Sequence, residues 1–81
     1  MDVGEMPNIG HVLAGRLREV GIRTDVELLR VGDAAAFERL RATLPEDACT
    51  HTRLALAGAV RGVRWHVLEK GLRERLAEEA Q

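Results

Sequence analysis

The chain lacks the features by which secreted, membrane and disulfide-stabilised proteins are recognised. It has one Cys and therefore cannot form an internal disulfide, which fits a reducing cytoplasm. No apolar stretch approaches the roughly 18 residues of a membrane-spanning helix. No basic segment followed by an apolar run opens the chain, as it would in a signal peptide. We therefore expect a soluble cytoplasmic protein without membrane contact.

Aromatic residues are also scarce, with one Phe, one Trp and no Tyr, although 46% of the residues are hydrophobic. Much of this fraction is Ala, so we expect a thin aliphatic core with closely packed helices. The 81 residues suit a single domain over 1–81, because two domains would leave neither half enough chain to bury a core. A domain of this size is marginally stable alone, and a homodimer is one way to bury more surface.

Neither sign of charge is in excess, since 12 Lys and Arg residues face 13 Asp and Glu residues. This balance argues against a strongly basic, non-specific nucleic-acid binder, although it leaves room for a local basic patch. Lys70 is the single Lys, and all other cations are Arg. Arg suits bidentate contact with phosphate or carboxylate, but coding bias in a GC-rich genome explains the excess equally well.

The stretch from Met6 to Leu29 carries the clearest local signals. Before it, residues 1–5 have no period, so we expect a loose end or one frayed turn. Pro7 to Gly10 is a turn signal, because Pro fixes φ while Asn and Gly tolerate left-handed backbone. The residues that then recur at helical spacing are Val12, Leu13, Leu17 and Val20. Gly21 is predicted to end this helix in a left-handed conformation, with Ile22 folding back.

Four further short helices follow from similar signals. Thr24 and Glu27 have capping-box spacing at the start of a second helix, which Gly32 ends. Asp33 is predicted to cap a third helix, which Pro45 stops. A fourth helix contains Leu54 to Val63, and a closing helix has an apolar stripe at Leu68, Leu72 and Leu76. The predicted fold class is therefore all-α, a compact bundle of about five short helices containing a helix-hairpin-helix-like corner.

Small residues recur at intervals of three and four along the fourth helix, at Ala55, Gly58, Ala59 and Gly62. They predict a narrow groove that a neighbouring helix can approach closely. We interpret it as internal packing, with a partner site as the alternative.

Asn8, Ile9 and Gly10 are the first candidate contact residues, because a tight turn before a helix can present backbone N–H groups to a phosphate. His11 follows directly, and Arg16 and Arg18 could add charge, although one helix cannot point both in the same direction. The alternative is a turn that only joins packed helices.

Arg53, Arg61 and Arg64 form a second candidate patch together with His51 and His66. Its local charge is positive because no acid occurs between Asp47 and Glu69. Such a surface can contact an anionic partner. It is also ordinary for a solvated helix face, and exposed charges alone are weak evidence.

Cys49, His51 and His66 are the residues that could suggest metal binding or catalysis. A structural zinc site needs four ligands, and the chain has no Cys-x-x-Cys pair. A Cys–His nucleophile would need a supporting motif and a substrate cavity, and we find neither. We expect no metal, no cofactor and no enzyme activity, with Cys49 as a small buried thiol.

Several segments together resemble the C-terminal domain of the TfoX/Sxy family, bacterial proteins associated with regulation of natural competence. They are PNIG at Pro7 to Gly10, Ala14-x-x-Leu17, VGIRT at Val20 to Thr24, Leu28-Leu29, Gly32 to Leu40, and LALAGAVRGVRWHVL at Leu54 to Leu68. The resemblance covers nearly the whole chain. It implies an all-helical domain related to helix-hairpin-helix folds, linked to transcriptional control of DNA uptake and present here as a stand-alone copy.

Two functions remain as hypotheses. The first is a small non-enzymatic regulatory or adaptor module that acts through protein contacts, with another protein or with a second copy of itself. The alternative is a module that binds the DNA backbone through the turn and the neighbouring Arg residues. Asn8 stands where DNA-binding hairpins have Gly, and His11 where they often have Lys or Arg, which favours the first hypothesis. No small-molecule substrate is indicated.

Overall fold

Five α-helices joined by short turns form the chain in a computed structural model, which describes residues 1–81 except the side chain of Asp47. The α-helices are α1 (His11–Glu19), α2 (Asp25–Val31), α3 (Asp33–Thr43), α4 (Thr50–Arg61) and α5 (Lys70–Glu79). Three 3₁₀ helices accompany them, η1 (Val3–Glu5), η2 (Pro45–Asp47) and η3 (Trp65–Val67). The part of the chain that the structure describes contains no strand, and the predicted all-α bundle of about five helices is confirmed.

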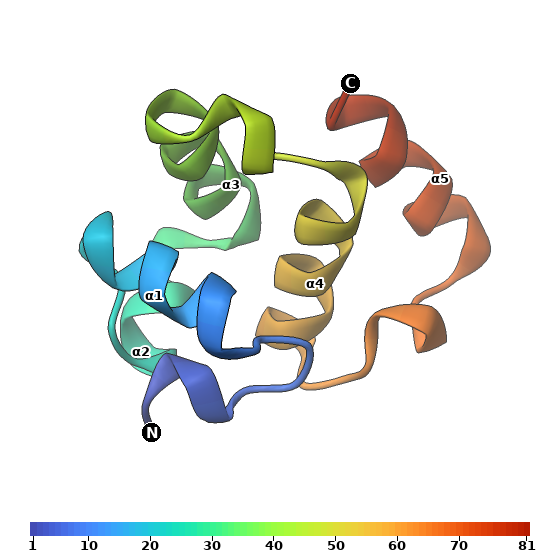
Figure 1. Cartoon of the computed structure of the whole chain (residues 1–81). Helices are drawn as coiled ribbons and strands as arrows, with labels where there is room; N and C mark the ends of the chain where they lie inside the picture. Colours follow the sequence, from blue (N-terminus) through green and yellow to red (C-terminus); the bar gives the residue numbers. More distant parts are fainter.

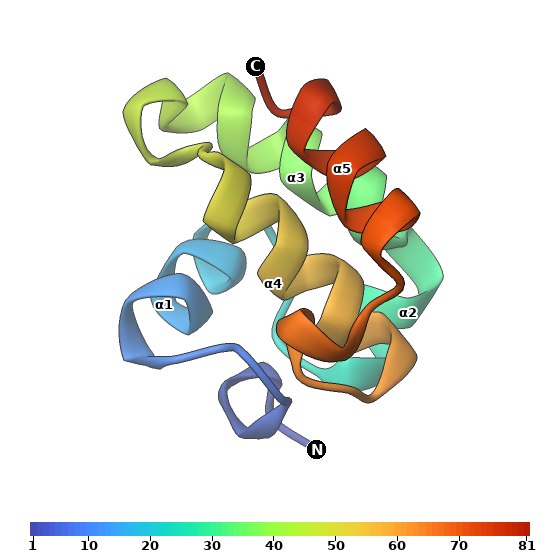
Figure 2. The same ribbon diagram turned by 90° about the vertical axis from the view of Figure 1, so that its right-hand side faces the viewer.

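Helix α4 runs through the middle of the molecule, with α1 and α2 on one side, α3 above and α5 on the opposite side (Figures 1 and 2). The small residues of α4 allow the neighbouring elements to pack closely around it. Ala55, Gly58 and Ala59 are buried, which confirms their interpretation as internal packing, whereas Gly62 is exposed and ends α4 with φ 71°. A Cβ on Gly58 would lie only 2.7 Å from the carbonyl oxygen of Val63.

The corner between α1 and α2 is built by two local motifs. Gly21 has φ 87°, and the N–H of Ile22 donates to the carbonyl of Leu17 at 2.9 Å, so α1 ends in a Schellman motif. Ile22 and Leu17 are both fully buried. The Thr24 hydroxyl accepts from the N–H of Glu27 at 3.2 Å and begins α2. The predicted end of α1 and the Thr24 cap of α2 are confirmed, while the carboxylate of Glu27 accepts from the Thr24 hydroxyl at 3.2 Å. The helix-hairpin-helix-like corner stays a prediction. A helix-hairpin-helix motif needs a helix on each side of its hairpin, and only the 3₁₀ turn η1 precedes the Pro7–Gly10 turn.

Residues 1–5 were expected to form a loose end or one frayed turn; they contain one 3₁₀ turn, η1, which is bonded to the domain, so the loose end is wrong. Val3 is fully buried in the core, and its N–H donates to the carbonyl of Arg23 at 2.9 Å. Asp2 and Thr24 form an isolated antiparallel bridge. The amino group of Met1 lies 3.1 Å from the carboxylate of Asp25. Pairing with a segment twenty residues away thus orders this end.

The start of α3 also differs from its prediction. Gly32 occupies the N-cap position and Asp33 is the first helical residue, so Asp33 does not cap the helix. Its carboxylate instead accepts a hydrogen bond from Arg53 of α4 at 2.6 Å. A contact across the bundle has replaced the local cap.

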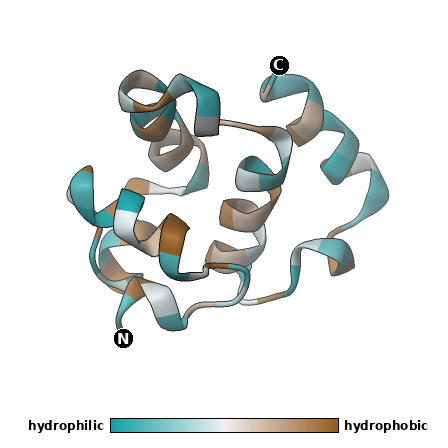
Figure 3. Ribbon diagram, in the orientation of Figure 1, coloured by the Kyte–Doolittle hydropathy of each residue, from teal (hydrophilic) through white to brown (hydrophobic). Residues whose placement is uncertain are grey.

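Two groups of buried apolar side chains make up the core. Figure 3 shows hydrophobic residues on the inner sides of the helices. The larger group spans η1 to α4 and includes Phe37. The smaller group holds α5 on α4 through Leu54, Ala57, Leu68 and Leu76. Leu68 precedes α5. Arg73 of α5 fixes the segment that leads into this helix by donating to the carbonyls of His66 and Leu68. Within the described residues, no helix has the length and apolar character needed to cross a membrane.

Candidate contact surface

Asn8 is the central residue of the Pro7–Gly10 turn and has a left-handed conformation with φ 71°. Its side chain points into the protein. Nδ2 donates to the carbonyl of Val63 at 2.9 Å and more weakly to that of Ala55 at 3.4 Å. Oδ1 accepts from the N–H of Trp65 at 3.0 Å. Asn8 therefore ties the turn to the end of α4 and to η3, and its amide is not displayed to a ligand.

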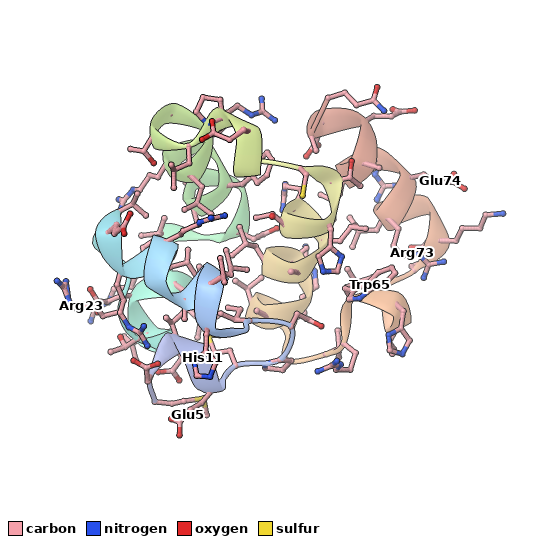
Figure 4. The ribbon with its side chains drawn as sticks, viewed as in Figure 1. Glu5, His11, Arg23, Trp65, Arg73 and Glu74 are labelled. Carbon is pink, nitrogen blue, oxygen red and sulfur yellow. The ribbon has the colours of Figure 1, made fainter. Side chains whose placement is uncertain are left out.

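The remaining residues of this turn differ in exposure. Ile9 is buried in the core. Gly10 is exposed, precedes α1 as its N-cap with an ordinary φ of −90°, and has no heavy atom within 4 Å of the place where a Cβ would lie. His11 is also exposed and lies at the start of α1 (Figure 4). Backbone N–H groups in the first turn of a helix have no intrahelical partner, so this end of α1 is open to an acceptor.

A hollow of about 400 Å³ lies beside the turn, and we call it the turn hollow. Its lining residues are Met6, Asn8, Ile9, Gly10, His51, Arg64 and Trp65. Arg64 is exposed, and the His51 ring meets Trp65 edge-on at a centroid distance of 5.7 Å. Trp65 lies beside α4 in Figure 4. The structure thus brings Arg64 of the second predicted patch next to Gly10 of the first.

The other two Arg residues of that patch lie elsewhere. Arg53 is only 5% exposed, and its guanidinium lies 2.6 Å from Asp33 and 3.6 Å from Glu79. Arg61 donates to the carbonyl of Ala57 at 2.8 Å and lies 3.6 Å from Asp33. The prediction that Arg53, Arg61 and Arg64 share one exposed face is wrong, because the carboxylate of Asp33 draws Arg53 into the protein.

This buried pair has an electrostatic consequence for Asp33. Burial alone raises the pKa of the Asp33 carboxyl, but the hydrogen bond and the charge of Arg53 outweigh burial and hold that pKa below its usual value. The pair therefore stays ionised at neutral pH and joins α3 to α4.

Arg16 and Arg18 also separate, as expected for two residues on one helix. Arg18 lies 2.6 Å from the carboxylate of Asp2, which also accepts from the N–H of Gly4 at 2.8 Å. Both hydrogen bonds lower the pKa of the Asp2 carboxyl, and the bond from Gly4 has the larger effect. Arg16 lies on the other side of α1, where it lines a second depression.

That depression is a groove of about 340 Å³ between α1, α3 and α4. We call it the apolar groove; its lining residues are Asn8, Gly10, His11, Val12, Leu13, Arg16, Leu40, Leu44, His51, Thr52 and Ala55. Most of its lining surface is apolar, and Val12, which lines it, is 65% exposed. The sequence analysis did not identify this groove, because its lining comes from three helices that are separate in the sequence. The adjacent pair Val12 and Leu13 was the available signal, since both cannot be fully buried on one helix face.

Cys49 is exposed at the N-cap of α4, so the prediction of a buried thiol is wrong. Its sulfur lies 3.5 Å from the Thr52 hydroxyl, and this contact lowers the pKa of the thiol. His51 and His66 each meet Trp65 edge-on rather than each other. Among the described residues, no three His, Cys, Asp or Glu side chains are grouped so that they could hold a metal ion.

These observations define a small all-helical domain with an organising turn, an open helix start and an apolar groove beside it. The chain belongs to the TfoX C-terminal domain family, whose model matches residues 2–80. The resemblance inferred from the PNIG, VGIRT and LALAGAVRGVRWHVL segments is thereby confirmed. The family supports a small domain of the competence-regulator type.

Two solved structures from Listeria monocytogenes have the same fold. An uncharacterized protein in a triclinic crystal form is 40% identical, with a TM-score of 0.93 over 100% of this chain and 91% of that chain. A protein of unknown function in a tetragonal form is 37% identical, with a TM-score of 0.87 over 99% of this chain and 100% of that chain. No curated protein matches the chain.

Proposed function

We propose that this chain is a non-enzymatic regulatory or adaptor domain that acts by binding another protein. The observation that carries this proposal is apolar surface left open on a small domain. The large hydrophobic side chains that are at least half exposed are Met1, Val12, Val26, Leu29 and Val67. Val12 borders the apolar groove, so at this place exposed apolar surface adjoins a concave site.

The distribution of charge agrees with a protein partner. Arg53 is buried in a pair with Asp33, and Arg18 is paired with Asp2. Two of the Arg residues expected to contact phosphate are therefore engaged in ion pairs within the chain, that of Arg53 buried and that of Arg18 exposed. The net charge of −1 gives no long-range attraction to nucleic acid.

Two measurements test this proposal. Size-exclusion chromatography with light scattering determines whether the chain binds a second copy of itself. Affinity capture from a bacterial lysate, with the retained proteins identified by mass spectrometry, determines whether it binds another protein. We expect stoichiometric retention of a defined partner or a concentration-dependent dimer. A strictly monomeric chain that retains no protein would contradict the proposal.

DNA-backbone binding is the second candidate, and the turn hollow is the observation that favours it. Gly10 leaves the start of α1 unobstructed, and Arg64 and His51 line the same hollow. Together they could receive one phosphate, through backbone N–H groups and a guanidinium. One such contact is a small number for a DNA-binding surface, so we rank this function second.

Titration of labelled duplex DNA at low and moderate salt tests the second candidate, since phosphate contacts must weaken as salt rises. Gly10→Asp and Arg64→Gln are used together to probe the turn hollow. Because Gly10 has an ordinary φ and open surroundings, Asp there should cap α1 and raise the free energy of unfolding by a few tenths of a kcal/mol. If DNA binds at the turn hollow, Gly10→Asp and Arg64→Gln should abolish binding while the fold is retained. Absence of binding at low salt, or binding that both variants retain, would refute this site.

A further inference from the structure

Helix α5 lies at the edge of the molecule and rests chiefly on α4 (Figure 1). Its apolar contacts belong to the smaller group of the core, together with Leu54 and Ala57 of α4. Leu76 is the one buried residue within α5, whereas α4 buries every residue from Arg53 to Ala59. At the far end, Arg41 of α3 donates to the carbonyl of Glu79 at 3.0 Å, and Ala80 packs against the larger group. One neighbouring helix therefore supplies most of the surface that holds α5.

The sequence of α5 gives the helix little stability of its own. It has ten residues, and helices of fewer than about 12–15 residues are marginal in isolation. Glu69 at the N-cap makes no side-chain capping bond, and Gly71 lies in the first turn. Lys70 lies at the positive end of the helix dipole and Glu79 at the negative end, so both charges oppose the dipole. Because α5 is helical mainly through its contact with α4, its local unfolding should require less free energy than unfolding of the whole domain.

The face of α4 beneath α5, which we call the α5 seat, consists of Arg53, Leu54 and Ala57. These residues are at most 8% exposed while α5 is in place. Leu54 and Ala57 receive the apolar side of α5, and Nη2 of Arg53 lies 3.6 Å from the carboxylate of Glu79. Opening of α5 would expose this apolar surface and remove one partner of Arg53. The α5 of a second copy has the same side chains, so it can replace every contact that is lost.

We propose that α5 is an exchangeable helix, which opens from the α5 seat and is replaced there by the α5 of a second copy of the chain. The hinge lies within residues 66–69, because Asn8 holds Val63 and Trp65 directly before it. This inference rests on the proposed function, for which a second copy is one of the two kinds of partner.

Hydrogen exchange of the full chain, followed by NMR, tests the opening of α5. We expect the amides of α5 to be about 100-fold or more less protected than those of α4. Gly71→Ala should slow this opening about threefold to fivefold, because Ala favours the helix. The added Cβ would lie 3.0 Å from a carboxylate oxygen of Glu69, whose side chain is exposed and can move. Gly15→Ala in α1 is the matched control and should leave the exchange of α5 unchanged.

A fluorescently labelled peptide of residues 66–81 tests the replacement. Its anisotropy should rise on titration with the full chain, and a peptide with Leu72→Asp and Leu76→Asp should not bind. The chain's own α5 competes with the peptide, so the apparent affinity reflects the fraction of chains that are open. Leu76→Ala in the chain removes a buried side chain from this competitor and should tighten binding of the unaltered peptide about tenfold or more. Gly71→Ala in the chain should weaken that binding about threefold to fivefold, which retains the comparison if Leu76→Ala does not fold.

Light scattering tests the second copy as the natural occupant of the α5 seat. The concentrated chain should contain a dimer, and excess peptide should dissociate it. A dimer that excess peptide leaves intact would assign self-association to another surface and overturn the inference. Equal protection of α5 and α4, or peptide binding that neither chain variant changes, would also overturn it.

The proposed function can stand if this inference fails. A chain that captures a defined protein from lysate, but neither binds the peptide nor forms a dimer, supports the proposed function and refutes the exchange of α5. A strictly monomeric chain that binds neither the peptide nor any captured protein refutes both.

Discussion

Asn8 is predicted to be the polar residue on which the fold depends most, and two substitutions separate its contributions. Asn8→Gly removes the side-chain hydrogen bonds but keeps the left-handed backbone readily accessible. Asn8→Ala removes the same bonds and adds the steric cost of a Cβ at φ 71°. The difference between the two variants therefore measures the backbone term alone.

The magnitudes follow from the contacts of the Asn8 amide. The bonds to the Val63 carbonyl at 2.9 Å and from the Trp65 N–H at 3.0 Å have good lengths, while that to Ala55 at 3.4 Å is weak. Each bond contributes about 1 kcal/mol, and its loss leaves a partly buried partner unpaired. Asn8→Gly should therefore lower the free energy of unfolding by about 2–3 kcal/mol. The left-handed conformation should cost Asn8→Ala about 1 kcal/mol more. A chain of 81 residues has a total of roughly 4–12 kcal/mol, so either loss is large.

Urea denaturation followed by circular dichroism at 222 nm provides the measurement. Both variants should unfold at lower urea concentration with unchanged m-values, because the surface exposed on unfolding is the same. Asn8→Gly within about 0.5 kcal/mol of the unaltered chain would refute the bonding argument. Equal stability of Asn8→Gly and Asn8→Ala would refute the backbone argument.

Further predictions concern packing and charge. Gly58→Ala should destabilise the fold by about 2–3 kcal/mol, because its Cβ would lie 2.7 Å from the carbonyl oxygen of Val63. Gly15→Ala should stabilise the fold by up to about 1 kcal/mol, because Gly15 lies inside α1 with open surroundings. Thermal denaturation checks both variants. Arg53→Leu should cost about 2–3 kcal/mol at pH 7, because it leaves the carboxylate of Asp33 without its main partner. Since folding lowers the pKa of Asp33, the pair stabilises the fold at neutral pH and loses this effect as pH falls below about 4. The stability difference between Arg53→Leu and the unaltered chain should therefore shrink as the pH of the urea titrations is lowered below about 4. A difference that stays constant would contradict the role of Asp33.

The parts of the fold that the sequence predicted correctly depend on neighbouring residues. Gly21 and Ile22 end α1 through bonds that reach back less than two turns, and Thr24 caps α2 through Glu27, three residues later. Such motifs act through residues that are close in sequence, so their spacing carries the information.

The incorrect predictions for the N-terminal end, for Asp33 and for Arg53 depend on residues that are distant in sequence. Val3 is ordered by Arg23, and Asp33 by Arg53, twenty residues away in each case. No local pattern distinguishes an Arg that meets a buried carboxylate from one on a solvated face. The apolar groove requires three helices at once, so it also could not be predicted from any one of them.

The two candidate functions meet at the same turn. Asn8, Gly10 and His51 line both the turn hollow and the apolar groove. A ligand in the hollow and a ligand in the groove would both lie against Gly10, at the start of α1. The two ligands should therefore exclude each other.

Residues that line only one of the two sites separate these functions. Val12 lines the groove but not the hollow, and Arg64 lines the hollow but not the groove. Gly10→Asp affects both sites, so this variant alone cannot distinguish a protein partner from DNA. Loss of binding with Val12→Asp but not with Arg64→Gln identifies a partner in the groove, and the reverse identifies a phosphate. Asn8 contributes equally to either function, because its hydrogen bonds to Val63 and Trp65 hold the turn in the position that both sites require.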